Sequence, residues 1–506
     1  MRLSAPFLAA GRAAGRWRDA LIDPARREGA VFVSLALYVL LWTAYGTIAK
    51  SSQGLHPDMT EVIAWSRDLS LGYFKHPPLA AWVVWLWFAV FPVAEWSYYL
   101  LAMLMPAIAL WIVWRISADY LAADKRIIGL ALLTFVPFFN FHALKFNVNT
   151  VLIPLWAATT WFFLMSVRTR SPVWAALAGV AAAGAMLGKY WSVFLLAGLV
   201  MAAVVDERRA AYFRSSAPWI TIVAGFAALA PHAIWLPLHD FAPFSYATIV
   251  HGVKPFTTVF LGALGYIVGG FGYVAVPLIV TLAIARPNGK MLADIGWPRE
   301  TERRLVAVAF WAPLLLPGVG AVIGRTEITS LWSMSSFTLL PVLLLSSPLL
   351  SVKRIEVTRV LLAAAAFPMV MLIASPVIAA MAQRAGPPPA SAQASLLSLE
   401  VERLWYQSTP RPLRLVGGDA DLAYGVATYA ADRPRPLTGL SALPASEVSR
   451  DGLVWLCFAE DAACREEAAI REGLGGKRFE MQIVRNFFRI PGKPQRYTIV
   501  VLPPRP

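Results

Sequence analysis

The chain has 506 residues, of which 58% are hydrophobic and 15% are charged, and its formal net charge is +15. Soluble domains carry about 25% charged residues, and the high apolar content also excludes disorder over most of the length. We therefore predict a polytopic membrane protein with a soluble appendage. We interpret the excess of Lys and Arg as fixing membrane orientation and contacting anionic lipid, and we expect no nucleic-acid partner.

The N-terminal residues 1–29 are basic and are predicted to be cytoplasmic. No small-residue cleavage site follows the first apolar run, so this run is expected to be a retained span rather than a signal peptide. Eleven runs approach the roughly 20 apolar residues that a spanning helix needs. These runs are 30–49, 97–114, 127–142, 150–167, 173–188, 190–205, 217–236, 257–285, 305–323, 331–350 and 357–380.

A twelfth apolar run, 78–95, is short, follows Pro77 and is rich in tryptophan. Tryptophan favours the membrane–water interface, so this run is predicted to lie along the interface. With that assignment the basic loops all fall on one side of the membrane. The positive-inside rule then predicts eleven crossings, a cytoplasmic N-terminus and a C-terminus outside.

The last span is followed by a Pro/Ala/Ser linker, expected at 385–399, and by a soluble domain at 400–506. Alternating apolar residues predict a small α/β domain. Its expected strands are 413–416, 453–458, 479–488 and 497–502, and its expected helices are 419–431 and 462–472. Cys457 and Cys464 either pair in an oxidising compartment or remain two free thiols.

The first outer loop, 51–96, contains two acidic residues near the start of a helix expected over 59–70. Asp58 is placed to be the N-cap of this helix. Glu61 follows three residues later, as in a capping box. Both residues therefore have a structural interpretation. A capping aspartate still leaves one carboxylate oxygen available for chemistry.

The other outer junctions hold basic and amide side chains and few carboxylates, all expected at one level of the membrane. They are His142, Lys145, Asn147, Asn149, Lys189, Tyr190, His251, Lys254, Arg325 and Glu327. A lysine such as Lys189, between two apolar runs, either reaches the surface or faces a polar cavity. Taken together, the set suits an anionic group such as a phosphate. Neither metal-ligand spacing nor a nucleotide-binding loop is present, so we expect no cofactor and no metal.

The segment 57–82, with Gly-Tyr-Phe-Lys-His-Pro-Pro-Leu at 72–79, resembles the signature of bacterial GT-C membrane glycosyltransferases. These enzymes are relatives of the lipid A aminoarabinose transferase and of protein O-mannosyltransferases. The resemblance implies a transmembrane glycosyltransferase domain over 30–384, with 51–96 as its catalytic outer loop. It implies inverting transfer of a sugar from a polyprenyl-phosphate donor to a lipid or glycan acceptor. The reaction would occur at the periplasmic face of the inner membrane.

The resemblance also implies roles for individual residues. Asp58 matches the catalytic aspartate, which acts as general base on the acceptor. Lys75 and His76 match the charged pair before the prolines, and Lys189 matches a lysine that follows the fifth span. Two positions depart from the family pattern: Met59 replaces the usual second acid, and Asn149 stands where many members have Asp. Glu61 is a candidate replacement for that second acid.

Several alternatives remain open from the sequence. The acceptor can be a protein side chain instead of a lipid or glycan, and Met59 and Asn149 raise the possibility of a non-catalytic homologue. A transporter or flippase of lipid-linked sugars would need polar residues at mid-bilayer depth. The polar residues here gather at one edge, which favours an enzyme. A single carboxylate among cations also differs from the two-carboxylate arrangement of hydrolases.

Overall fold

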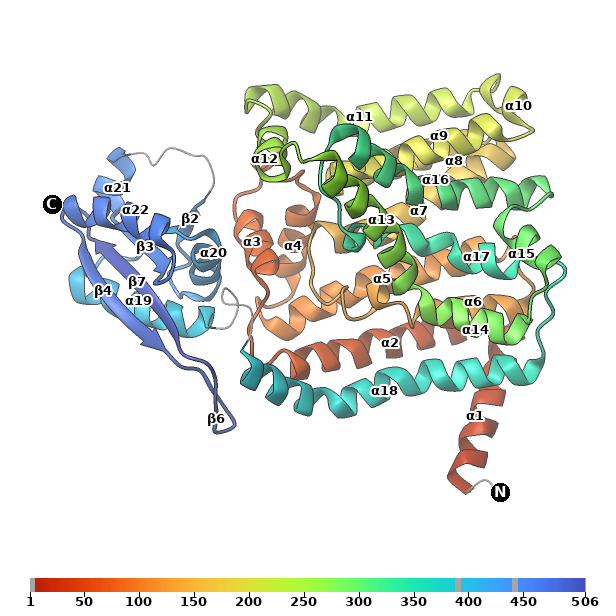
Figure 1. Ribbon diagram of the computed structural model, residues 1–506, viewed down its shortest axis with the longest axis horizontal. Coiled ribbons are helices and arrows are strands. Elements are labelled where there is room, and N and C mark those ends of the chain that lie inside the picture. The colour runs from red at the N-terminus through yellow and green to blue at the C-terminus, as the bar shows by residue number, and fades with distance from the viewer. Residues whose placement is uncertain (1–4, 387–392, 439–444, 506) are drawn as a thin grey trace. The chain divides into compact units, whose positions relative to one another are not determined.

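The computed structural model describes residues 5–386, 393–438 and 445–505 (Figure 1). The chain divides into two compact units, which we describe separately. The first unit comprises Met1–Thr43, Ser70–Ala80 and Tyr99–Met371. The second unit comprises Ala44–Leu69, Ala81–Tyr98 and Leu372–Pro506.

Long apolar helices confirm a multi-pass membrane protein. Within the described residues, seven helices are long and apolar enough to cross a membrane. They are α2 (Arg27–Ala49), α5 (Glu95–Ser117), α7 (Val148–Thr169), α11 (Ala217–Leu238), α13 (Phe256–Tyr273), α16 (Thr301–Gly324) and α18 (Arg354–Ala385). The shorter apolar segments are α4 (Leu79–Val90), α8 (Pro172–Gly188), η2 (Tyr190–Ser192) with α9 (Val193–Val205), α14 (Ala275–Ala285), and η4 (Ser336–Leu339) with α17 (Leu340–Leu345).

The remaining helices of the first unit are shorter or more polar. They are α1 (Ala5–Ile22), α6 (Ala123–Leu133), η1 (Pro137–Phe139), α10 (Arg209–Phe213), α12 (Ala242–His251), α15 (Gly289–Gly296) and η3 (Ser330–Ser333). Within this unit α8 packs against both α7 and α11 (Figure 1). The backbones of α8 and α11 approach closely, because a Cβ on Gly179 would lie 2.3 Å from the Thr221 carbonyl oxygen. Such glycines allow close helix packing in membranes.

Three of the expected spans are interrupted at prolines. The run 127–142 is helical only to Leu133, and Pro137 then begins η1. The run 257–285 is split at Val274, which places Pro277 in the first turn of α14. The run 331–350 forms 3₁₀ turns and the six-residue α17, with Pro341 in its first turn. Proline lacks the backbone N–H of an interior helical turn, and a new turn begins near it at these three positions, so apolar length alone overestimated these helices.

Helix α4 has 12 residues. At 1.5 Å per residue it is about 18 Å long, which is shorter than the roughly 30 Å hydrocarbon core. This length agrees with an interfacial helix. The total of eleven crossings stays a prediction.

The second unit contains α3 (Pro57–Ser66) and a five-stranded sheet in the order β2-β1-β3-β7-β4. Strands β2, β1 and β3 are parallel, whereas β7 runs antiparallel to β3 and β4. The strands are β1 (Leu415–Gly418), β2 (Arg435–Leu437), β3 (Leu453–Phe458), β4 (Lys477–Ile483) and β7 (Gln495–Leu502), with a small ribbon of β5 (Asn486–Phe487) and β6 (Ile490–Pro491). The helices are α19 (Ala394–Ser408), α20 (Ala420–Tyr429), α21 (Ala445–Asp451) and α22 (Ala462–Gly473).

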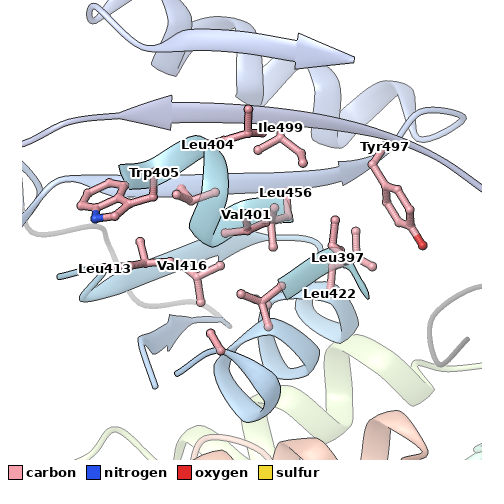
Figure 2. Packing of buried hydrophobic residues seen from close by; sticks show 14 of the residues in the cluster. Leu397, Val401, Leu404, Trp405, Leu413, Val416, Leu422, Leu456, Tyr497 and Ile499 are labelled. Carbon is pink, nitrogen blue, oxygen red and sulfur yellow. The ribbon is translucent and has the colours of Figure 1, made fainter. Parts of the chain in front are cut away.

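Apolar residues cover both faces of this sheet. On one face, Leu397, Val401 and Trp405 of α19 pack with Leu422 of α20 onto Ile499 and neighbouring strand residues (Figure 2). On the other face, Ala468 of α22 packs against Trp455 and Val500. The expected small α/β domain is therefore confirmed. The third expected strand ends at Ile483 rather than 488, and β2, α19 and α21 were not predicted.

The end of β3 and the start of α22 are joined covalently. Cys457 and Cys464 form a disulfide with a Cα–Cα distance of 5.7 Å. The sequence left open whether these cysteines pair or remain free thiols, and in the structure they pair. Helix α19 begins at Ala394, inside the range 385–399 expected to be a linker, and residues 387–392 of that range lie outside the described residues.

Candidate active site

Asp58 lies in the first turn of α3, but it is not the N-cap that the sequence predicted. The N-cap is His56, whose Nδ1 accepts a 3.1 Å hydrogen bond from the Asp58 backbone N–H. Pro57 occupies the first helical position, which shifts the start of α3 towards the N-terminus. The Asp58 side chain is 36% exposed, and its Oδ1 lies 3.6 Å from His56 Nδ1. A carboxylate in the first turn is stabilised by the helix dipole.

The other acid of α3 has a different environment. Glu61 is only 7% exposed, and Met59 is fully buried, with 1% exposure. Glu61 acts electrostatically on Tyr424 of α20; burial, followed by the Glu61 charge, raises the pKa of the Tyr424 phenol. Glu61 is thus the buried acid of α3, and position 59 is part of the apolar core.

Helix α20 holds the segment that carries Asp58. The Tyr429 hydroxyl accepts a 2.9 Å hydrogen bond from the Leu55 N–H and donates one of 2.8 Å to Glu95 Oε1. Arg67, just after α3, donates a 2.6 Å hydrogen bond to the Ala427 carbonyl. Burial, together with the Arg433 charge, lowers the pKa of Arg67 to about 10. Sequence analysis did not identify Tyr429, because its partners lie more than 300 positions away.

In the first unit, Lys189 is held by an amide and two indoles. Its Nζ donates a 2.9 Å hydrogen bond to Asn149 Oδ1. The same Nζ lies 4.6 Å from the ring centroid of Trp332 and 6.0 Å from that of Trp191, distances at which cation–π attraction operates. Trp191 in turn donates a 3.1 Å hydrogen bond to the Trp332 carbonyl. Lys189 and Asn149, both expected at the site, are therefore brought together.

A histidine that sequence analysis missed joins Tyr190 to the loop before Lys75. The Tyr190 hydroxyl lies 2.7 Å from His232 Nε2, and His232 Nδ1 lies 2.6 Å from the Leu71 carbonyl oxygen. A carbonyl can only accept, so Nδ1 carries the proton. In the neutral imidazole Nε2 is then the acceptor, and Tyr190 donates. His232 sits inside an apolar helix, where a lone histidine gives no pattern to detect.

The loop 70–80, which carries Lys75 and His76, packs on α11 and α12. The Lys75 Nζ lies 5.7 Å from the ring centroid of Tyr246, and Phe74 contacts the same ring edge-on at 5.6 Å. The Tyr73 N–H donates to the His76 carbonyl at 3.0 Å, which closes a turn. Tyr190 stacks on Phe244 of α12 at 4.8 Å. Lys75 and Tyr190 are thus tied to the same two helices.

Glycine is required at position 72 in this loop. A Cβ there would lie 2.4 Å from the indole ring of Trp235 on α11. Since such a contact is far inside van der Waals distance, a larger residue would push the loop away from α11. Packing against Trp235 therefore constrains the residue at position 72 of the Gly-Tyr-Phe-Lys-His run, independently of any chemical role of its side chains.

The other predicted residues serve different local roles. Asn147 is the N-cap of α7 and accepts hydrogen bonds from the N–H groups of Asn149 and Thr150. Burial and the Lys145 charge lower the pKa of His142. Arg325 and Glu327 are exposed, and Glu327 lies 4.0 Å from Lys254. His251 ends α12, and its side chain lies outside the described residues.

Comparisons with known proteins bear on this arrangement. Residues 75–235 match the family model of dolichyl-phosphate-mannose-protein mannosyltransferases. The fold is similar to that of ArnT from Cupriavidus metallidurans bound to undecaprenyl phosphate, with a TM-score of 0.62, 13% identity, and coverage of 93% of this chain and 97% of ArnT. The apo structure of the same ArnT gives a TM-score of 0.60 at 13% identity, with coverage of 94% and 98%. No curated protein sequence matches the chain.

The resemblance read from the sequence is therefore confirmed. The chain has an ArnT-like fold, with a bundle of apolar helices followed by a small sheet-containing domain. The family match and this fold indicate a membrane glycosyltransferase.

Proposed function

We propose that the protein transfers a sugar, with inversion, from a polyprenyl-phosphate-linked donor to a lipid or envelope glycan acceptor of the lipid A type. The donor class is supported by the structurally similar ArnT, which was solved bound to undecaprenyl phosphate. The observation that carries the proposal is the Lys189 ammonium, held 2.9 Å from the neutral amide of Asn149. An ammonium that is oriented in this way can bind an anionic leaving group through charge-assisted hydrogen bonds.

In this mechanism the leaving group is a lipid phosphate, which needs charge stabilisation rather than a proton. Lys75 and Lys189 are the cations that supply it, and His76, Tyr190, Asn149, His251, Arg325 and Glu327 are the proposed donor- or acceptor-binding groups. Preorganised charges aimed at developing negative charge contribute strongly to catalysis. The bond between the sugar and the phosphate breaks, and the polyprenyl phosphate leaves with the electron pair.

Asp58 is the proposed general base. It accepts the proton of the acceptor hydroxyl while the acceptor oxygen attacks the anomeric carbon of the sugar. Its support is the position in the first turn of α3, with the side chain 36% exposed. Glu61 is the proposed partner acid, in place of the family acid at Met59, and Asn147 positions Asn149 as the cap of α7.

The tail of the donor requires an apolar route. A groove of about 370 Å³ in the first unit is lined by α7, α8, α9 and α11. One end is lined by Met186, three residues before Lys189, and by Leu229, three residues before His232. We propose that the polyprenyl tail occupies this groove.

The proposed location is the bacterial inner membrane, with the C-terminal domain in the periplasm. The Cys457–Cys464 disulfide supports this side, since disulfides persist in oxidising compartments. The corresponding domain organisation is a basic N-terminus at 1–29, a transmembrane glycosyltransferase domain at 30–384 with the catalytic loop 51–96, a linker at 385–399 and a periplasmic domain at 400–506.

The experiment is complementation of a deletion strain, followed by mass spectrometry of its envelope lipids. Wild type restores a sugar-modified species, and Asp58→Asn does not, although it inserts at the wild-type level. Asp68→Asn, an exposed aspartate in the same loop, is the matched control and restores the species. If Asp58→Asn restores the modified species, Asp58 is not the base.

The experiment also tests the alternatives. A protein O-glycosyltransferase would leave the envelope lipids unchanged and modify protein instead. A flippase would move the lipid-linked sugar without breaking its bond to phosphate. Release of free polyprenyl phosphate by the purified protein, supplied with donor and acceptor, distinguishes transfer from transport.

A further inference from the structure

The tip of the β5–β6 ribbon in the second unit exposes an aromatic side chain. Phe487 pairs with Ile490, so Phe488 and Arg489 alone form the turn between the two strands. The ribbon projects away from the five-stranded sheet (Figure 1). Phe488 is 86% exposed, the largest value among the large hydrophobic residues that the structure describes. Its ring contacts Phe487 edge-on at 4.8 Å, and the rest of the chain leaves it almost uncovered.

The turn holds these two side chains in a strained backbone conformation. The φ angle is 44° at Phe488 and 65° at Arg489, both in the left-handed region. Two-residue hairpin turns of this kind favour Asn and Gly, which tolerate a positive φ. A bulky residue with a positive φ is uncommon and unfavourable. The formation of the turn therefore does not account for Phe and Arg at these positions.

Three hydrogen bonds attach the base of the ribbon to the ends of two membrane-spanning helices. Gln383, two residues before the end of α18, donates from Nε2 to the Arg485 carbonyl at 2.7 Å and to the Ile490 carbonyl at 3.1 Å. The Arg485 guanidinium donates a 2.9 Å hydrogen bond to the carbonyl of Ser51, two residues after the end of α2. The ribbon therefore begins where α2 and α18 leave the membrane.

Exposed apolar side chains of α18 indicate the level of the membrane surface. Val377 is 61% exposed and Met381 is 64% exposed, so the lipid-facing side of α18 extends to within two residues of Gln383. At 1.5 Å per residue this separation is about 3 Å along the helix. Phe488 lies two residues beyond Ile490, about 7 Å in a strand, and the headgroup layer is itself roughly 5–7 Å thick. The tip can therefore reach that layer, and Figure 1 shows it close to the level at which α18 ends.

The three segments that meet at the base of the ribbon are basic and contain no acidic residue. They are 44–55, 372–386 and 484–495, and their basic residues are Lys50, Arg384, Arg485, Arg489 and Lys493. Arg384, Arg489 and Lys493 are exposed, and within the described residues none of the three has an ion-pair partner. The Lys493 side chain passes the end of α18, since a Cβ on Gly386 would lie 2.9 Å from its Cδ. This charge is complementary to an anionic surface at the same level.

We propose that the β5–β6 ribbon docks on the membrane surface at the ends of α2 and α18, with Phe488 in the headgroup layer of an anionic phospholipid membrane. Arg384, Arg489 and Lys493 bind the lipid phosphates. Amphipathic elements bind this interface with apolar rings inserted and with Lys and Arg at the headgroups. Because the base of the ribbon is bonded to helix ends, the surface beside the exposed ring is the lipid around α18. The inference is independent of the proposed function.

The first test places a fluorophore at the tip of the ribbon. Both cysteines are paired, so Phe488→Cys gives full-length protein a single site for the environment-sensitive dye NBD. In nanodiscs that contain phosphatidylglycerol and one copy of the chain, we expect blue-shifted emission and strong quenching by lipids with a nitroxide near the headgroup. Ile470→Cys, at a residue of α22 that is 62% exposed in the same domain, is the matched control and should be quenched little.

A second pair of variants tests the charges. In the protein labelled at position 488, Arg489→Gln is expected to lower the ratio of docked to undocked ribbon about fivefold, the equivalent of ~1 kcal/mol. Arg411→Gln, at an exposed arginine of the same domain outside the ribbon, should leave this ratio unchanged. Equal quenching at positions 488 and 470, equal quenching in pure phosphatidylcholine, or a blue shift that requires two copies per nanodisc would each overturn the proposal.

Discussion

The Lys189 ammonium donates a 2.9 Å hydrogen bond to the Asn149 side-chain oxygen and lies 4.6 Å from the Trp332 ring. The amide and the ring orient the ammonium group. An aspartate at position 149 would form an ion pair at the same distance. The amide of Asn149 therefore positions the lysine without adding a negative charge at this position.

Replacing Lys189 tests its role toward the donor. Lys189→Gln keeps a hydrogen-bonding side chain but removes the charge, and it is expected to lower kcat/KM by about 10²-fold, typical of losing one electrostatic stabiliser. Lys290→Gln, at an exposed lysine of α15 outside the proposed site, is expected to change kcat/KM little. Steady-state assays with purified donor measure both. Equal losses in the two variants would indicate a general surface-charge effect.

His232 is predicted to position the loop that carries Lys75. His232→Ala leaves the Tyr190 hydroxyl and the Leu71 carbonyl without this buried partner, at a cost of about 1–3 kcal/mol. We expect faster proteolytic cleavage within 70–80 and a raised KM for donor. Thr248→Ala, at an exposed residue of α12 whose hydroxyl bonds the Ser245 carbonyl, is the control. Unchanged cleavage and KM would mean that the Tyr190–His232–Leu71 contact does not order the loop.

Tyr429 is predicted to affect activity through the segment that carries Asp58. Tyr429→Phe removes the hydroxyl that joins Leu55 and Glu95, so hydrogen exchange of residues 51–66 should accelerate and kcat should fall. Tyr406→Phe removes an exposed hydroxyl in the same domain, bonded to Asp432, and should change neither. Slow exchange in Tyr429→Phe together with low activity would contradict this indirect role.

Asp294 and Arg303 give a pH-dependent prediction for stability. The 2.8 Å hydrogen bond from Arg303 lowers the pKa of Asp294 in the folded protein. The ionised Asp294 therefore stabilises the fold fully above the unfolded pKa of about 3.9, and this stabilisation is lost as pH falls through the lower folded value. Asp294→Asn leaves Arg303, 8% exposed, without this partner, costing about 3 kcal/mol at pH 7.

Melting curves in detergent from acidic to neutral pH measure this effect. The difference in melting temperature between wild type and Asp294→Asn should become smaller below about pH 4. Glu300→Gln, which removes an exposed acid from the adjoining segment, should melt like wild type at every pH. A gap that does not change with pH would show that the loss arises from packing rather than from the carboxylate charge.

The disulfide gives a prediction for the C-terminal domain. Replacing both Cys457 and Cys464 by alanine should destabilise the domain by about 2 kcal/mol, the loop-entropy value for so short a loop. Proteolysis of the domain at increasing temperature measures the loss. Wild type treated with reductant should behave like the double variant, whereas the double variant should not respond to reductant.

The sequence predicted the features that depend on composition and local pattern. Apolar runs identified the long helices, and alternation identified β3 and β7 with nearly correct bounds. The pattern over 72–79 led to the family, which the match over 75–235 supports. Helix ends were less accurate where Pro137, Pro277 or Pro341 interrupts an apolar run, because composition does not show where the backbone hydrogen bonds stop.

Other features depend on contacts between distant parts of the chain. His232 and Tyr429 acquire their roles from Leu71 and Leu55, 161 and 374 positions away, and no local pattern records such pairs. His56 is the cap because its imidazole nitrogen accepts the backbone N–H of Asp58, the second residue of α3. Capping preferences rank residue types, but they do not decide which of several adjacent residues caps a given helix.

The hydroxyl of Tyr429 meets Leu55 across 374 positions, and Arg67 meets the Ala427 carbonyl across 360. The segment that carries Asp58 leaves the ribosome early, whereas α20, which bonds to it, is synthesised late. A nascent chain that has inserted all its apolar helices therefore still lacks these hydrogen bonds. Premature termination after the last of those helices would yield an inserted but inactive product. The protein therefore becomes active only after α20 has been synthesised.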